Sequence, residues 1–153
     1  MVSFNEKYKE RTYKLAVEIV KYCVTLKEQK VPYPIIDQLL RSGTSFAANF
    51  RAASEARSDK EYFAKLSIAI EEGDESLMWI NLLADTEIVS KDDAYSFLFS
   101  ETEELVKIIS TVKRKVGERL ENNYYSNKKT NNIMNEIDEM IYDNFKNPNP
   151  DNP

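Results

Sequence analysis

The residues best suited to chemistry are polar side chains that recur at helical spacing between positions 38 and 79. Arg41, Ser45 and Asn49 stand four residues apart, so a helix presents them on one face. A second set shares one side of the next helix, at steps of seven, three and four: Lys65, Glu72, Glu75 and Trp79. Two carboxylates as close as Glu72 and Glu75 can act together as general acid and general base.

The groups that such carboxylates would need beside them are missing. The chain has no histidine and a single cysteine, and it contains no glycine-rich phosphate loop and no catalytic-triad pattern. Helical bundles that bind two irons use Glu-x-x-His pairs, which this sequence cannot supply. We therefore predict no enzymatic activity, no metal and no cofactor.

Three interpretations of the polar set follow. If the two faces meet, Arg41 and Lys65 can pair with Glu72 and Glu75, and Asn49 can satisfy the remaining hydrogen-bonding groups. A structural polar network that sets helix register is the favoured interpretation. Contact of some of these groups with a partner subunit comes second, and catalysis comes last.

The elements that position these residues are predicted to be four long helices. The chain has only three glycines and five prolines, so turn signals are rare. Ser58 with Glu61 three residues later forms a predicted capping box, and Ser90 is a second predicted N-cap. The expected helices cover residues 4–30, 34–56, 58–84 and 90–120.

Apolar residues mark the buried faces of these helices. In the first helix they recur with a spacing of three and four, at Leu15, Ala16, Ile19, Val20, Cys23 and Leu26. The fourth helix has an apolar face that includes Phe97 and Leu98. In the second helix, small residues cluster around Gly43 and predict the closest helix crossing of the domain.

Four long helices with short loops predict an all-α, up-down-up-down antiparallel four-helix bundle over residues 1–120. Residues 121–153 form an asparagine-rich, polar tail, predicted to be partly disordered and mobile, or to form a short docking helix near 131–145. The apolar positions of that helix are Ile133, Ile137, Met140 and Ile141.

Charge and hydropathy limit where the protein acts and what it binds. Without an apolar run long enough to span a membrane and with one cysteine, a cytoplasmic location is expected. With a net charge of −5, the protein has no overall positive electrostatic field that would attract nucleic acid. A local basic run remains, namely Lys113, Arg114, Lys115 and Arg119. It either complements the dipole at the end of the fourth helix or contacts an anionic partner such as RNA or DNA. The acidic residues 71–75 could neutralise it within the molecule or across an oligomer.

The pattern of these residues resembles a bacterial protein family. The run from Gln38 to Asn49 (QLLRSGTSFAAN), then Ser54-Glu55, Ser58-x-Lys60 with Phe63 and Lys65, and Glu72-x-x-Glu75-x-x-x-Trp79, looks like the four-helix-bundle family of 23S rRNA intervening-sequence proteins. The likeness covers roughly residues 5–120. Two positions depart from the usual pattern: Met78 replaces an aromatic residue, and Gly73 replaces a helix former.

The resemblance implies a protomer of four helices that assembles as a ring, commonly a homopentamer. Genes of the family occur within insertions of 23S rRNA genes and elsewhere, and no enzymatic activity is established for it. A more distant resemblance is to the accessory protein of diversity-generating retroelements, a pentamer that binds a reverse transcriptase and nucleic acid through a basic surface. The acidic charge of the present chain argues against direct nucleic-acid binding.

Overall fold

Four α-helices make up the fold, and among residues 3–146 there is no strand. The structure, a computed structural model, describes the backbone of residues 3–146 and the side chains of residues 3–138. The helices are α1 (Phe4–Glu28), α2 (Tyr33–Ser54), α3 (Asp59–Asp85) and α4 (Asp93–Lys146). The chain divides into a first unit, residues 1–116, which we call the body, and a second unit from residue 117.

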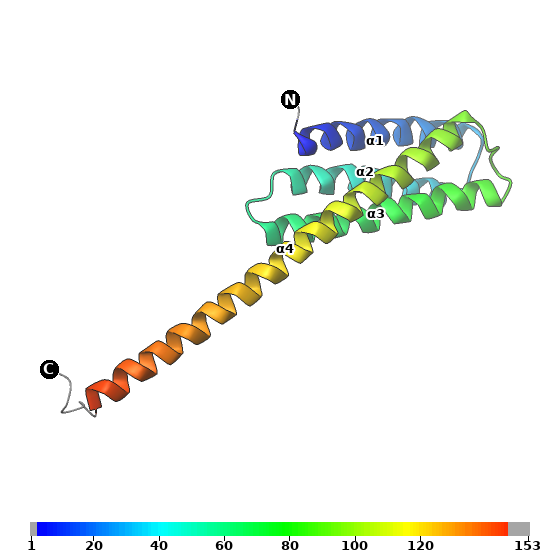
Figure 1. The fold of residues 1–153 in the computed structure, drawn as a ribbon. Coiled ribbons are helices and arrows are strands. Elements are labelled where there is room, and N and C mark those ends of the chain that lie inside the picture. Colours follow the sequence, from blue (N-terminus) through cyan, green and yellow to red (C-terminus); the bar gives the residue numbers. More distant parts are fainter. Residues whose placement is uncertain (1–2, 147–153) are drawn as a thin grey trace. The chain divides into compact units, whose positions relative to one another are not determined.

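The body is the antiparallel four-helix bundle that the sequence predicts. Consecutive helices run in opposite directions and are joined by short loops (Figure 1). Helix α2 packs against both α1 and α3. The fully buried core takes three large side chains from each helix: Leu15, Ile19, Leu26, Leu39, Phe46, Phe50, Leu66, Ile80, Leu83, Leu98, Leu105 and Ile109.

Local hydrogen bonds explain where the helices begin. The Ser58 hydroxyl accepts from the Glu61 backbone N–H at 3.2 Å, as predicted, and the Glu61 carboxylate accepts from the Arg57 N–H, one residue before the cap. The predicted cap at Ser90 is wrong. Helix α4 begins two residues later than such a cap requires, and the carboxylate of Asp92 accepts from the Tyr95 N–H at 2.9 Å instead. Aspartate caps helices as well as serine does.

Helix α4 does not end near Leu120 as predicted. It continues to Lys146, because no proline interrupts residues 121–146 and asparagine costs only about 0.7 kcal/mol per residue in a helix. Within the second unit, the described side chains of residues 121–138 are all exposed. The side chains of Met140 and Ile141, and residues 147–153 altogether, lie outside the described residues.

The two body glycines lie where helices approach closely. A Cβ atom on Gly43 would lie 2.5 Å from Cδ1 of Ile19 on α1, and one on Gly73 would lie 2.6 Å from Cγ2 of Val106 on α4. Close approach around Gly43 is what the small residues of α2 predicted. At Gly73 the same packing explains the departure from a helix former, because any side chain there would displace Val106.

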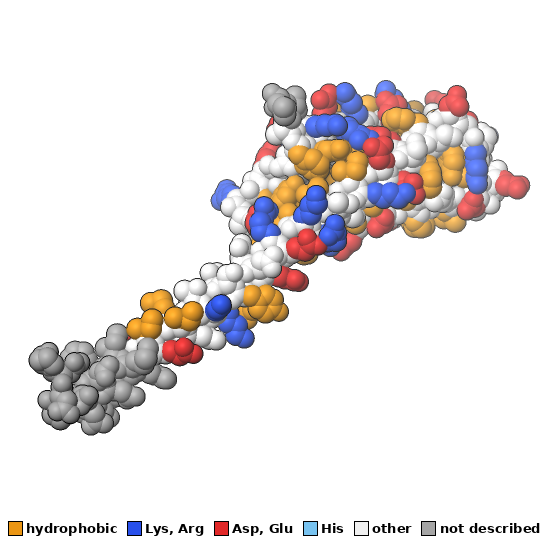
Figure 2. Space-filling model, viewed as in Figure 1, with side chains coloured by type: hydrophobic (Ala, Val, Ile, Leu, Met, Phe, Trp, Pro, Cys, Tyr) orange, Lys and Arg blue, Asp and Glu red, His pale blue; other side chains and the backbone are white. Residues whose placement is uncertain are grey.

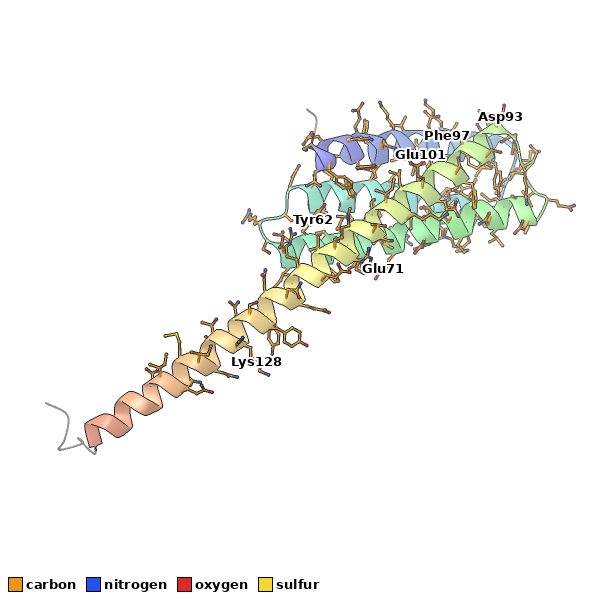
Figure 3. The ribbon with its side chains drawn as sticks, in the orientation of Figure 1. Tyr62, Glu71, Asp93, Phe97, Glu101 and Lys128 are labelled. Atoms are coloured by element: carbon orange, nitrogen blue, oxygen red, sulfur yellow. The ribbon has the colours of Figure 1, made fainter. Side chains whose placement is uncertain are left out.

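On the body helices, the predicted apolar faces include Val20 and Phe97, which are exposed instead of buried. Val20 on α1 and Phe97 on α4 keep 41% and 47% of their surface accessible. Both stand next to buried residues, Ile19 and Leu98, so the simple spacing of apolar residues could not separate the inner face from the outer one. Phe97 lies in the first turns of α4, shortly after Asp93 (Figure 3).

Candidate functional site

Arg41 joins α2 to α3 through the two glutamates that the sequence singled out. Its guanidinium donates to Glu72 at 3.4 Å and makes a shorter contact with Glu75. The Trp79 indole N–H donates to the same oxygen of Glu75 at 3.1 Å. The Arg41 side chain is 47% exposed, so this cluster lies at the surface of the α2–α3 crossing and not inside the core.

The electrostatics of this cluster suit an ion pair better than acid–base catalysis. The hydrogen bond from Arg41, with help from Trp79, lowers the pKa of Glu75, and the bond to Glu75 raises the pKa of Arg41. Glu75 is therefore ionised at neutral pH and cannot serve as a general acid there. Its acceptor oxygen is already occupied by two donors.

The remaining predicted members of the network do not join it. Asn49 donates from Nδ2 to the backbone carbonyl of Ser45 in its own helix, at 2.9 Å. Lys65 is half-buried and forms no hydrogen bond or ion pair with another described residue. Lys65 and Glu72 are two helical turns apart, roughly 10 Å along the axis, which is beyond the reach of direct pairing.

Beneath the ion pair, two serines connect the same helices. The Ser76 hydroxyl donates to the Ser42 hydroxyl at 2.9 Å, and the Ser42 hydroxyl lies 3.3 Å from the Leu39 carbonyl. Both serines are fully buried. The Ser76 hydroxyl also lies 2.9 Å from the Glu72 carbonyl of its own helix, so each serine keeps a partner within its helix, and the Ser42–Ser76 bond is the polar contact that this crossing adds.

A second ionic cluster, which the sequence did not single out, joins α1 to α4. Arg11 donates from Nε and Nη2 to the two carboxylate oxygens of Glu101, at 2.8 and 2.7 Å, and from Nη1 to Glu104 at 3.2 Å. Figure 3 shows Glu101 on the part of α4 beside α1. Ninety residues separate the pair, and the acidic run 101–104 was its only sequence signal.

The basic run of α4 is not at a helix end. Because α4 continues to Lys146, the explanation through the dipole of a helix C-terminus is wrong. In the body, Lys113 lies over the ring of Phe63, 5.1 Å from its centroid, and Arg114 and Lys115 are exposed. Arg119 belongs to the second unit.

No strong nucleophile is found among the described residues. Burial raises the pKa of the Cys23 thiol to about 11, so it stays protonated, and its Sγ lies 3.8 Å from the Ile36 carbonyl. Burial also raises the pKa of Tyr22 to about 12. Tyr22 borders a cleft of about 180 Å³ between α1 and the start of α4, where Phe97 forms part of the wall.

A groove of about 860 Å³ lies between α1 and α2. Its walls are mostly apolar or small, and Arg41, Glu72 and Glu75 do not line it. Figure 2 shows that hydrophobic side chains also gather in separate groups on the face of the body in view, with charged side chains between them.

This combination defines a class: an all-helical bundle whose polar side chains tie helices together and whose exposed surface carries apolar groups. Comparison with known proteins then gives the family. The family model of the 23S rRNA-intervening sequence protein matches residues 5–111, and the chain belongs to this family.

A solved structure supports the same assignment. The chain is similar to the crystal structure, at 1.70 Å resolution, of a protein of unknown function from the S23 ribosomal protein family of Bacteroides thetaiotaomicron VPI-5482. Identity is 30%, the match covers 72% of this chain and 97% of that one, and the TM-score is 0.67. The chain has no match among curated proteins. No helix in the described part of the chain is both long and apolar enough to cross a membrane.

Proposed function

We propose that the protein is a non-enzymatic assembly protein that acts as an adaptor. In this proposal its protomers form a closed homo-oligomeric ring of five. The observation that carries this proposal is the distribution of side chains in the body. Glu72, Glu75, Glu101 and Glu104 lie between helices and are paired with arginines, whereas large apolar side chains are exposed on more than one face.

A closed ring needs two different faces on each protomer, because each contact joins one face to another. One candidate is a row along α3, formed by Ile68, Met78 and Leu82, each more than one-third exposed. Another surrounds Phe97 at the start of α4, beside the cleft that Tyr22 borders. Apolar groups of this kind on separate faces are typical of interaction surfaces.

Light scattering at micromolar concentration tests the assembly. We expect a mass that is a multiple of the 17.8 kDa protomer, and we expect Met78→Glu to reduce it without loss of helix content. A monomeric wild-type protein would overturn the ring. A mass of four or six protomers would support a ring and change only the proposed number of protomers.

The absence of catalysis has its own test. Glu72→Gln with Glu75→Gln removes both carboxylates of the Arg41 cluster while keeping their shape. We expect the double variant to assemble as the wild type does and to bind the same partners. Recovery of a reaction product from the wild type, and its loss from a folded double variant, would establish an enzyme instead.

A second candidate function is supported by one observation, the position of the basic run inside a helix. Since Lys113, Arg114 and Lys115 do not complement a helix end, contact with RNA, DNA or a nucleic-acid enzyme is an alternative use for them. A ring would repeat this weak patch and raise its avidity. Titration of labelled structured RNA tests it. Binding that weakens steeply with salt and is lost in Lys113→Glu/Lys115→Glu supports the accessory role, and absence of binding at low salt excludes it.

A further inference from the structure

Helix α1 has a second apolar row, on the side opposite its core face. Tyr13, Val17, Val20 and Val24 follow each other at steps of four, three and four residues, the spacing of a coiled-coil seam. Tyr13, Val20 and Val24 are 64%, 41% and 56% exposed, and Val17 is half-buried. Leu15, Ile19 and Leu26 already supply the inner face, so the outer row contributes little to the core of its own protomer.

Tyr13, Val17 and Val20 of the outer row line one wall of the 860 Å³ groove, and α2 forms the other. The α2 wall consists of the small residues Thr44, Ala47 and Ala48, with Arg51 at its end. Small side chains beside a larger apolar row allow another helix to approach closely. The groove is therefore shaped for a helix that contacts the α1 row and rests against α2.

The charges at the two ends of the row indicate which helix fits. One further seam step in each direction reaches Glu10 and Lys27, both exposed and of opposite sign. When a second copy of α1 lies antiparallel, a single register places Glu10 opposite Lys27 of the second copy. The same register places Tyr13 opposite Val24, and Val17 opposite Val20, each pair occurring twice. A parallel copy would instead place like charges at both ends.

In this register Lys14 lies opposite Lys21 of the second copy, and the ion pairs that both lysines form within their own helix reduce the repulsion between them. Lys14 and Lys21 flank the row, and each is paired at 2.7 Å with a glutamate of its own helix, Glu10 and Glu18 respectively. The contact from Glu10 to Lys27 would run for about 25 Å along the helix, which is long enough for a specific two-helix seam.

We propose that the outer row of α1 is an isologous interface, on which a second copy of this chain docks with its α1 antiparallel. Such a contact uses the same face on both copies, so it closes at two. It is separate from the ring contacts proposed above, and it would join two rings face to face. It would likewise make a simple dimer if no ring forms.

Val20→Glu is the first test, measured by light scattering and analytical ultracentrifugation. A charge in the middle of the seam should halve the mass of the assembly, while helix content and melting temperature stay unchanged because Val20 is exposed. Ile133→Glu, at a similarly exposed residue of the second unit, is the matched control and should keep the wild-type mass. An unchanged mass for Val20→Glu overturns the interface.

This measurement separates the interface from the ring. A wild-type dimer that becomes a monomer in Val20→Glu supports the α1 interface and rejects the ring. A larger wild-type assembly with the same mass in Val20→Glu supports the ring and rejects the α1 interface.

Charge exchange tests the register. Glu10→Lys and Lys27→Glu should each weaken pairing by about tenfold, since each places like charges at both ends of the seam, and the double variant should recover most of the affinity. Glu103→Lys, which also removes an exposed ion pair within one helix, controls for the loss of the Glu10–Lys14 pair. A double variant as weak as the single ones overturns the antiparallel register.

Crosslinking tests the orientation directly. Tyr13→Cys and Val24→Cys proteins, co-expressed and oxidised, should form a disulfide between one another, whereas neither should crosslink alone. The native Cys23 does not interfere, because it is buried. Crosslinking of either variant with itself indicates a parallel pair, and no crosslink in the mixture indicates no pair; both results overturn the proposal.

Discussion

Two arginines tie helices together in the body, and they do so in different surroundings. Arg11 forms a bidentate salt bridge with Glu101, and the side chains of Arg11 and Glu101 are only 24% and 19% exposed. Arg41 is 47% exposed and divides its hydrogen bonds between Glu72, Glu75 and Gln38. The first links α1 to α4, and the second links α2 to α3.

This difference shows that a polar pattern visible in the sequence is a poor guide to how much an ion pair contributes to the stability of the fold. Ion pairs near solvent contribute little, because water screens the charges and ordering two long side chains costs entropy. Loss of a salt bridge that is mostly shielded from solvent lowers stability more, because removal of one partner leaves the other charge desolvated and unpaired. Arg11 should therefore matter more to stability than Arg41, although Arg41 lies in the motif.

Replacing Arg11 with methionine should have the largest effect. It leaves the carboxylate of Glu101 partly buried without its partner and should lower the free energy of unfolding by about 2 kcal/mol, less than for a fully buried pair. Urea denaturation followed by circular dichroism measures it. Lys107→Met, which breaks an exposed pair with Glu103, is the control and should change stability by less than about 0.5 kcal/mol.

Arg11→Lys should have an intermediate effect. The charge remains, but an ammonium cannot make two parallel hydrogen bonds to Glu101, so a loss of about 1 kcal/mol is expected. The same denaturation experiment measures it. Equal stability of Arg11→Lys and wild type would show that charge alone, and not the bidentate geometry, holds α1 to α4.

Arg41→Met should have a smaller effect than either Arg11 substitution, because solvent reaches this cluster and the Ser42–Ser76 bond remains to hold the crossing. Chemical denaturation of the two methionine variants side by side provides the comparison. If Arg41→Met proved as damaging as Arg11→Met, exposure would not explain the difference between the clusters.

The smallest effect concerns pH. Arg41 lowers the pKa of Glu75 in the folded protein below its ordinary value of 4.5. The stability that results is present above the unfolded-state pKa and is lost as the pH falls through the lowered folded-state pKa. The stability difference between wild type and Arg41→Met should thus be largest above about pH 5 and shrink in more acidic solution. Denaturation curves between pH 3 and pH 7 measure it, and a difference that grows on acidification would contradict the assignment.

Local features of the fold could be predicted from the sequence. The Ser58 cap and the apolar spacing of each helix depend on neighbours within a few residues. Helix order and antiparallel packing follow because the loops between helices are short. The pairing of Arg41 with Glu72 and Glu75 was also accessible, since both faces can be read from helical spacing.

The N-cap and the C-terminal end of α4 could not be predicted from the sequence, because the local signals were ambiguous. Ser90 and Asp92 are both good caps, and only the packing of α4 selects one of them. A change in composition after Leu120 resembled a boundary, yet nothing in the backbone chemistry of asparagine forces a helix to stop.

By itself, then, the sequence determined four helices, their buried faces in outline, and the family pattern around Gln38–Trp79. The tertiary structure alone decided that Glu101 faces Arg11, that Val106 covers Gly73, and that Val20 points away from the core. These facts depend on the rotation and register of whole helices, which are set by the packing of many side chains at once and not by the spacing of residues along any one helix.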